Sequence, residues 1–248
     1  MKTKILFATA LVACSIACNK SNDNNSALEP SSLHNRSVGS SASELLSADK
    51  YKSLQVEVQY MAGFAPDATA INHLKSFLET YLSKPDGISI ITREIQATAN
   101  TVLNADEIHA IEKANRTAFS AGTELAIYIL YTNGNYSDNN VLGVAYRNTS
   151  AAILGKKVRD NSGGIGQASR AKLEATVLEH EVGHLVGLVG VGTPMQTAHK
   201  ANGSHCNNQA CLMYYASETT DVLGFLVTGN IPPLDAPCIN DLKANGGK

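Results

Sequence analysis

The chain has 248 residues, with 20 Lys and Arg against 22 Asp and Glu and a formal net charge of −2. It lacks the basic cluster that binding to a phosphate backbone requires, which excludes nucleic acid from the expected partners. Residues 50–248 are numerous enough for one domain with a sizeable hydrophobic core.

The N-terminus has the pattern of an export signal. A short basic region precedes the apolar run Ile5–Ala17, which is too short to span a bilayer as a stable anchor. Small residues precede a cysteine twice, at Cys14 and at Cys18, as in the lipobox of bacterial lipoproteins. We therefore expect a lipoprotein signal peptide at 1–17 and lipidation of Cys18, where the apolar run stops, or of Cys14. The expected location is the bacterial cell envelope, at the outer membrane or the cell surface; the alternative is a plain secretory signal.

Residues 18–49 are rich in Ser, Asn and Asp and poor in aromatic side chains. Such a segment cannot bury enough apolar surface to offset the entropy lost on ordering, so the composition predicts a flexible surface tether. His34 belongs to this segment and is expected to be solvated. The folded domain is then expected at 50–248.

The first half of the domain alternates strands and helices. A period-2 pattern predicts a strand at 53–60, a helical face follows at 71–81, and a β-branched run predicts a second strand at 88–95. Asn104 and Glu107 form a capping-box pattern that opens a helix ending near Gly122.

Three further strands and a long helix complete the regular part. The strands are expected at 125–131, 141–146 and 151–158, with an antiparallel edge among them. A glycine-rich connection at 163–166 lacks the Lys-Ser/Thr of a phosphate loop and leads into an amphipathic helix at 169–189. The order β-α-β-α-β-β-β-α, followed by irregular chain, predicts an α+β domain with a mixed, twisted β-sheet.

The last helix carries the sequence His180-Glu181-Val182-Gly183-His184. Histidines at i and i+4 share one helical face and can reach one metal ion, and the adjacent glutamate can act as general base for a metal-activated water. The alternative is an amphipathic helix whose histidines are exposed or hydrogen-bonded. A catalytic zinc uses three protein ligands and an open position, so a third ligand must come from elsewhere.

The residues from His180 to Gly190 resemble the HExxHxxGxxH pattern of metzincin metallopeptidases, with Gly187 at the turn glycine and Gly190 in place of the last histidine. Downstream, the segment 205–213 has the form H-C-x4-C-x-M, which resembles the archaemetzincin branch. The resemblance implies a metzincin-like fold with an HExxH active-site helix and an irregular C-terminal subdomain. It also implies a Met-turn at Met213.

The same resemblance implies that His205 is the third metal ligand. His199 lies in the same inserted segment and is the rival, since spacing does not decide between them. A different clan of zinc peptidases would use a carboxylate as third ligand, for which Glu218 is the candidate we rank last. Tyr215 resembles a metzincin tyrosine that touches the metal or hydrogen-bonds the transition-state oxyanion, although Tyr214 is adjacent to it.

The cysteines depart from the archaemetzincin pattern, in which four of them hold a second, structural zinc. Beside Cys206 and Cys211 this chain has only Cys238 in its C-terminal part, so four cysteines are not present for such a site. For an exported protein we expect a Cys206–Cys211 disulfide. Whether Cys238 is free or pairs with one of these two cysteines stays open.

The expected function is therefore that of a zinc-dependent endopeptidase acting on a protein or peptide substrate. His180, His184 and His205 would bind Zn²⁺ as neutral imidazoles, and Glu181 would take the proton of the attacking water. The alternative is a non-catalytic surface binding lipoprotein that keeps the metzincin-like fold and the metal, which the missing histidine at Gly190 suggests.

Overall fold

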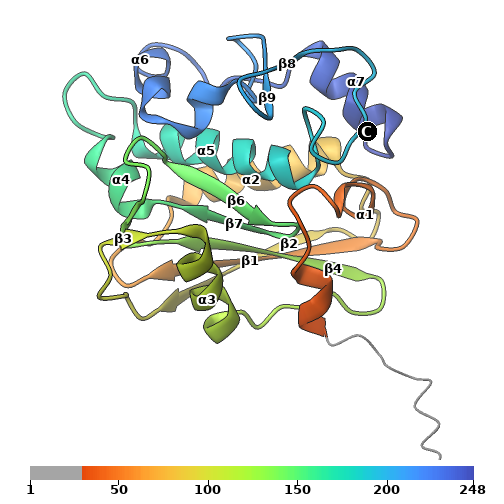
Figure 1. Ribbon diagram of the computed structural model, residues 1–248, viewed down its shortest axis with the longest axis horizontal. Helices are drawn as coiled ribbons and strands as arrows, with labels where there is room; N and C mark the ends of the chain where they lie inside the picture. Colours follow the sequence, from red (N-terminus) through yellow and green to blue (C-terminus); the bar gives the residue numbers. More distant parts are fainter. Residues whose placement is uncertain (1–29) are drawn as a thin grey trace, which may run out of the picture.

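The computed structural model describes residues 30–248 and is built on a five-stranded sheet with the order β2-β1-β4-β7-β6 (Figure 1). The strands are β1 Ser53–Met61, β2 Ile88–Ile95, β4 Glu124–Tyr131, β6 Gly143–Arg147 and β7 Ser150–Ile153. Neighbouring strands are parallel except for β6 and β7, which are antiparallel. The predicted antiparallel edge is thus confirmed, in a sheet that is mostly parallel.

Helices cover both faces of this sheet. They are α2 Ala68–Tyr81 and α5 Arg170–Leu185 on one face and α3 Ala105–Asn115 on the other (Figure 1). The central strand β4 is buried at every position after the first, as its continuous apolar run predicts. Its alternate residues belong to two hydrophobic clusters: Ile127 and Ile129 to one, Tyr128 and Leu130 to the other.

Helix α3 begins at the predicted capping box but ends earlier than predicted. The Asn104 side chain accepts hydrogen bonds from the first turn, and the Glu107 side chain accepts from the Asn104 backbone. The helix stops at Asn115 rather than near Gly122, because Arg116 leaves the helical conformation and buries its guanidinium group against Glu112 at 2.7 Å.

Two other element boundaries differ from the prediction. The strand expected at 151–158 ends at Ile153, and helix α4 (Gly155–Asp160) takes up the rest. Gly155 lies so close to the Thr132 carbonyl that a Cβ would be 2.8 Å from its oxygen, which places a turn here. Helix α5 ends at Leu185 rather than near 189, because Gly187 has a φ of 77° and turns the chain back.

The remaining elements are short. They are η1 Pro30–His34, α1 Ala42–Leu46, β3 Val102–Leu103, β5 Asn135–Tyr136, β8 Lys200–Ala201, β9 His205–Cys206, η2 Tyr215–Glu218, η3 Thr220–Val222, α6 Leu223–Leu226 and α7 Ala236–Ala244. Those after α5 form a layer above that helix, on the side away from the sheet (Figure 1). No helix among residues 30–248 has the length and apolar character needed to cross a bilayer.

The predicted tether is wrong for residues 30–49, which pack on the domain. Leu45 and Leu46 on α1 are 0–1% exposed and belong to the main hydrophobic cluster. His34 is buried rather than solvated: its Nε2 accepts from the Ser120 backbone at 3.0 Å, and its Nδ1 hydrogen-bonds Thr149 at 2.8 Å. Burial of Leu45 and Leu46, together with the hydrogen bonds of His34, helps to offset the entropy lost on ordering these residues, which their polar composition did not reveal. The signal peptide at 1–17, Cys14 and Cys18 lie outside the described residues.

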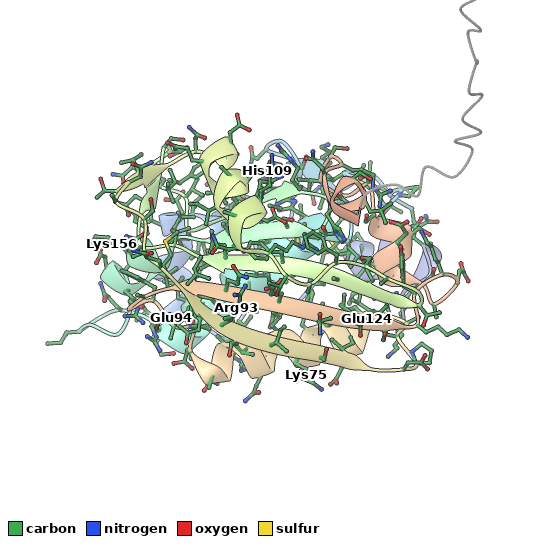
Figure 2. All side chains as sticks on the ribbon, turned by 90° about the horizontal axis from the view of Figure 1, so that it is seen from below. Lys75, Arg93, Glu94, His109, Glu124 and Lys156 are labelled. Atoms are coloured by element: carbon green, nitrogen blue, oxygen red, sulfur yellow. The ribbon has the colours of Figure 1, made fainter. Side chains whose placement is uncertain are left out.

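The two faces of the sheet differ in chemistry. Figure 2 shows the face that carries α3, with His109 on that helix and Arg93 and Glu94 on the outer strand β2. His109 hydrogen-bonds Arg147 at 3.3 Å. The histidines of α5 lie on the opposite side of the sheet, so His109 is remote from them (Figures 1 and 2).

Candidate metal centre

Helix α5 carries two of the histidines of the site. The Ser169 side chain caps its first turn by accepting from the Lys172 backbone, and all residues from Leu173 to Leu185 are buried. His180 and His184 lie one turn apart on this helix, with their Nε2 atoms 3.1 Å from each other. A fully buried helix end of this kind holds both imidazoles in fixed positions.

His205 approaches the two α5 histidines from the hairpin of β8 and β9. Its Nδ1 hydrogen-bonds the Asn202 carbonyl at 2.8 Å, just as His180 Nδ1 hydrogen-bonds the Leu212 carbonyl at 2.7 Å. Because a carbonyl only accepts, each Nδ1 must carry the proton, and in the neutral ring the Nε2 lone pair then faces the other histidines. Carbonyl partners of this kind orient metal-binding imidazoles in proteins.

Glu218, at the end of η2, joins the three histidines. Its Oε1 lies 3.2 Å from His205 Nε2, and its Oε2 lies 3.5 Å from His180 Nε2 and 3.7 Å from His184 Nε2. The donor atoms of these four residues all lie within 4.8 Å of one another. From the sequence, Glu218 was the candidate third ligand ranked last. The structure places it in the group in addition to His205, not as a substitute for it.

The spacing of these donors fits a zinc ion. Ligands about 2.0–2.1 Å from a tetrahedral zinc lie ~3.3–3.4 Å from one another, and four of the distances here are 3.1, 3.2, 3.5 and 3.7 Å. Inward-facing lone pairs and a carboxylate repel each other unless a cation lies between them. The donor set of three imidazoles and one carboxylate suits Zn²⁺ in both number and kind.

The pKa values of these side chains reflect this crowding. Burial lowers the pKa of His184 to about 4, with the charges of His180 and His205 adding to the effect. Burial acts against the carboxylate form of Glu218, but the three histidine partners together hold its pKa well below the usual range. Burial lowers the pKa of His205, but its hydrogen bonds with Glu218 and with the Asn202 carbonyl raise that pKa above its ordinary value.

Glu181 is buried beside the histidines without a partner. Neither of its carboxylate oxygens has a hydrogen bond within the described part of the chain. Burial, followed by the nearby charge of Glu218, raises the pKa of Glu181 well above its ordinary value; the backbone amide of Ala145 lies near enough to oppose this rise but forms no hydrogen bond. An orphaned buried carboxyl with a raised pKa is typical of a general base or acid in an active site.

Met213 packs against the histidine helix at Gly183. A Cβ at Gly183 would lie 2.2 Å from the Met213 sulfur, so the glycine between the two motif histidines leaves room for this side chain. Met213 is fully buried, and its carbonyl accepts from the Cys206 backbone at 2.7 Å. The methionine thus connects α5 to the strand that carries His205.

The structure does not bring two other candidates to the cluster. His199 faces Cys238, with its Nε2 3.5 Å from the sulfur, and Asp241, also at 3.5 Å. Tyr215 packs on Tyr214 with ring centroids 4.6 Å apart. Within residues 30–248 its hydroxyl makes no hydrogen bond to the three histidines or to Glu181.

A second group of donors lies next to the first. It consists of Cys206, Cys211, Asp235 and Cys238, whose donor atoms are again within 4.8 Å of one another. Asp235 Oδ2 lies 3.3 Å from the Cys206 sulfur, and the sulfurs of Cys211 and Cys238 are 3.7 Å apart. Sulfurs about 2.3 Å from a tetrahedral zinc lie ~3.8 Å apart, so this spacing also fits the ion.

Backbone amides support the second group. Asp235 and Met213 each donate an N–H to the Cys211 sulfur at 3.4 Å. The hydrogen bond from Cys238, followed by these two amides, lowers the pKa of Cys211 against the effect of burial. A thiolate is the form of cysteine that binds metals.

The expected Cys206–Cys211 disulfide is wrong, because all three of these cysteines are free thiols in the structure. Asp235 completes this group of donors beside the three cysteines, and sequence reasoning missed it. One signal could have found it: Asp235 and Cys238 have the D-x-x-C spacing, in which a carboxylate stands where a C-x-x-C pair has its first cysteine. Asp235 also caps α7, accepting from the Cys238 backbone with its other oxygen.

No known family model matches the sequence, and no curated protein is similar to it. Among solved structures, an archaemetzincin from Methanopyrus kandleri superposes with a TM-score of 0.54 at 14% identity, over 78% of this chain and 96% of that one. Metalloproteinase-II from Bacteroides fragilis superposes with a TM-score of 0.47 at 14% identity, over 80% of this chain and 54% of that one. The first superposition shows that this chain has a mixed α/β, archaemetzincin-like fold.

Proposed function

We propose that the chain is a zinc-dependent endopeptidase. The observation that carries the proposal is the convergence of His180, His184 and His205 beside Glu181, a buried carboxyl without a hydrogen-bond partner. The archaemetzincin-like fold supports the same class of enzyme. The three histidines would hold the ion, which supplies Lewis acidity and lowers the pKa of a bound water when present.

The side chains around the ion have separate roles in the proposal. The carbonyls of Leu212 and Asn202 orient His180 and His205 through their Nδ1 atoms. Glu181 takes the proton of the attacking water and passes it to the leaving amine, a task that suits a carboxyl whose burial raises its pKa. Tyr215 stays a candidate for contact with the substrate, which would require it to turn away from Tyr214.

The substrate we propose is an extended stretch of protein. Strand β6 is the antiparallel edge of the sheet, and the carboxylate of Glu181 lies against its Gly143. An edge strand has backbone N–H and C=O groups that can pair with an extended peptide. A peptide bound along β6 would therefore present a backbone carbonyl close to Glu181 and the histidines.

The location belongs to the proposal as well. We infer from the sequence that the chain is exported and held at the cell envelope by a lipid on Cys18 or Cys14. A protein or peptide at the membrane surface would then be its substrate.

The second donor group would hold a structural zinc. Four protein donors, three of them buried thiols, leave no open position for a substrate, which is the arrangement of structural rather than catalytic zinc. Such an ion would fix the segment 205–213 and with it the position of His205.

The test is cleavage of an unstructured protein by the zinc-loaded chain, with and without a chelator, beside Glu181→Gln as the matched inactive variant. We expect cleavage that the chelator abolishes and that the variant lacks. The alternative is a non-catalytic surface binding lipoprotein, which the presence of a fourth protein donor at Glu218 favours. Bound zinc without chelator-sensitive cleavage would support that alternative.

A further inference from the structure

Glu218 stands where a catalytic zinc needs an exchangeable position. Its carboxylate contacts the Nε2 atoms of all three histidines at 3.2–3.7 Å, which are tetrahedral distances between ligands. A tetrahedral zinc held by three histidines and a carboxylate has no open coordination position, whereas hydrolysis needs such a position for water or substrate. Under the proposed function, on which this reasoning rests, the carboxylate has to leave the ion before a substrate can bind.

The backbone of Glu218 is anchored independently of its side chain. Its carbonyl accepts from the Leu142 backbone at 2.7 Å, and the next residue, Thr219, forms a β-bridge with Val141. These contacts attach the segment to the chain immediately before β6, the edge strand next to Glu181. The Cα of Glu218 is therefore fixed at the rim of the site.

The carboxylate, in contrast, is held by the histidines alone. Within residues 30–248 no hydrogen bond or ion pair joins it to any group other than His180, His184 and His205. The side chain is 22% exposed, so solvent reaches it from outside. A carboxylate on a flexible stem with one set of partners can leave them by rotation, without movement of the backbone.

We propose that Glu218 is a detachable fourth ligand that closes the metal site in the resting protein and leaves it when a substrate enters. Because the carboxylate is tethered next to the ion, it competes with water and substrate at a high effective concentration. An extended peptide that pairs with β6 would pass the segment that carries Glu218. Its carbonyl group would then take the coordination position that the Glu218 carboxylate leaves. The metal centre is thus self-inhibited by its own chain.

The experiment uses the full chain loaded with Co²⁺, whose visible absorption reports the number and kind of ligands, and titrates it with acetohydroxamate as an external ligand. The variants are Glu218→Gln and Glu218→Ala, and the matched control is Asp221→Asn, an exposed acid three residues away. We expect both Glu218 variants to change the absorption spectrum, to gain an exchangeable solvent ligand and to bind acetohydroxamate at least about tenfold more tightly. The control should behave as the wild type.

Spectra and acetohydroxamate affinities that are the same in the wild type and the Glu218 variants would overturn the inference, even if the protein cleaves peptides. A changed spectrum and tighter binding in the variants would support it, even if no substrate is cleaved. Loss of Co²⁺ from both Glu218 variants at stoichiometric metal would also overturn it, because a detachable ligand is not needed to retain the ion. Failure of this inference, seen in the spectra, can therefore be distinguished from failure of the proposed peptidase function, seen in the cleavage assay.

Discussion

The backbone of Gly143 lies directly against the carboxylate of Glu181. A Cβ at position 143 would be 2.7 Å from Glu181 Oε1 and 2.5 Å from the Cγ1 of Val177. The first residue of the edge strand is therefore in contact with the proposed general base, and a side chain larger than hydrogen would displace it. Strand β6 and helix α5 are positioned by the same contact.

Gly143→Ala should accordingly impair catalysis and stability together. Overpacking of this kind costs about 1–3 kcal/mol of unfolding free energy, and displacement of a catalytic group by 1 Å lowers turnover by about 10²-fold. Chemical denaturation and peptide cleavage measure the two effects. Gly224→Ala is the control, because a Cβ at Gly224 meets no atom within 4 Å. Wild-type turnover in Gly143→Ala would contradict the proposed role of Glu181.

Glu181→Gln should keep the metal and lose the activity. The amide is isosteric but does not accept the proton of the attacking water, and general-base catalysis contributes about 10²–10⁴-fold. Metal analysis and cleavage of an unstructured protein, both on the same preparation, check this prediction. Proteolysis that persists in a zinc-loaded Glu181→Gln preparation would refute the mechanism.

His205→Ala should lower the affinity for zinc at the histidine cluster, whereas His199→Ala should not. His205 Nε2 faces Glu218 in the cluster, while His199 faces Cys238 and Asp241. Zinc stoichiometry of the two purified variants at limiting metal gives the answer. If His199→Ala loses the catalytic zinc and His205→Ala retains it, the ligand assignment is wrong.

His34 should make the fold sensitive to acid. Burial, and then the charge of Arg116, lowers its pKa from 6.5 to about 3, so the unfolded chain binds a proton where the folded chain does not. Stability from this residue is therefore complete above pH 6.5 and is lost as the pH falls toward 3, on the order of 3 kcal/mol by pH 4. His34→Gln should flatten this part of the pH–stability curve measured by urea denaturation. Equal slopes for the two proteins between pH 6.5 and 4 would contradict the prediction.

Asp235→Asn should remove one of two zinc ions. The amide can still accept the hydrogen bond that caps α7 from Cys238, but it is a poor metal ligand, so the loss is specific to the metal. We expect two zinc ions per wild-type chain, one per variant chain, and a lower melting temperature for the variant. One zinc per wild-type chain, or a disulfide found by mass spectrometry, would argue against this structural site.

Local patterns in the sequence were sufficient for the strands β1, β2 and β4 and for the helices α2, α3 and α5, apart from some of their ends. The alternation in β1, the continuous apolar run of β4 and the capping box at Asn104 each depend on neighbouring residues, and the structure has both strands and the cap, although Glu57 and Gln59 on the polar side of β1 are buried. The i, i+4 spacing of His180 and His184 is local in the same sense, since one turn of helix brings the two rings together. Such features require no knowledge of the tertiary fold.

The remaining features depend on contacts between distant parts of the chain. Glu218 meets His180 across 38 residues, and no periodicity connects the two. His34 is buried by Thr149 and Ser120, more than 80 residues away, so a polar composition gave no sign that its segment is ordered. Asp235 is not found by counting cysteines, because a metal site depends on donor atoms and their positions, which the fold alone brings together.

One nine-residue segment, 205–213, serves both donor groups. It supplies His205 to the first group and Cys206 and Cys211 to the second, and its Leu212 carbonyl orients His180. The second group is completed only by Asp235 and Cys238, at the start of the last helix. A chain shortened before residue 235 would keep the whole HExxH helix and all three histidines, yet would lack two of the four donors of the second group. Under the proposed function, removal of the last fourteen residues would therefore loosen the segment that carries His205 without removing a catalytic side chain.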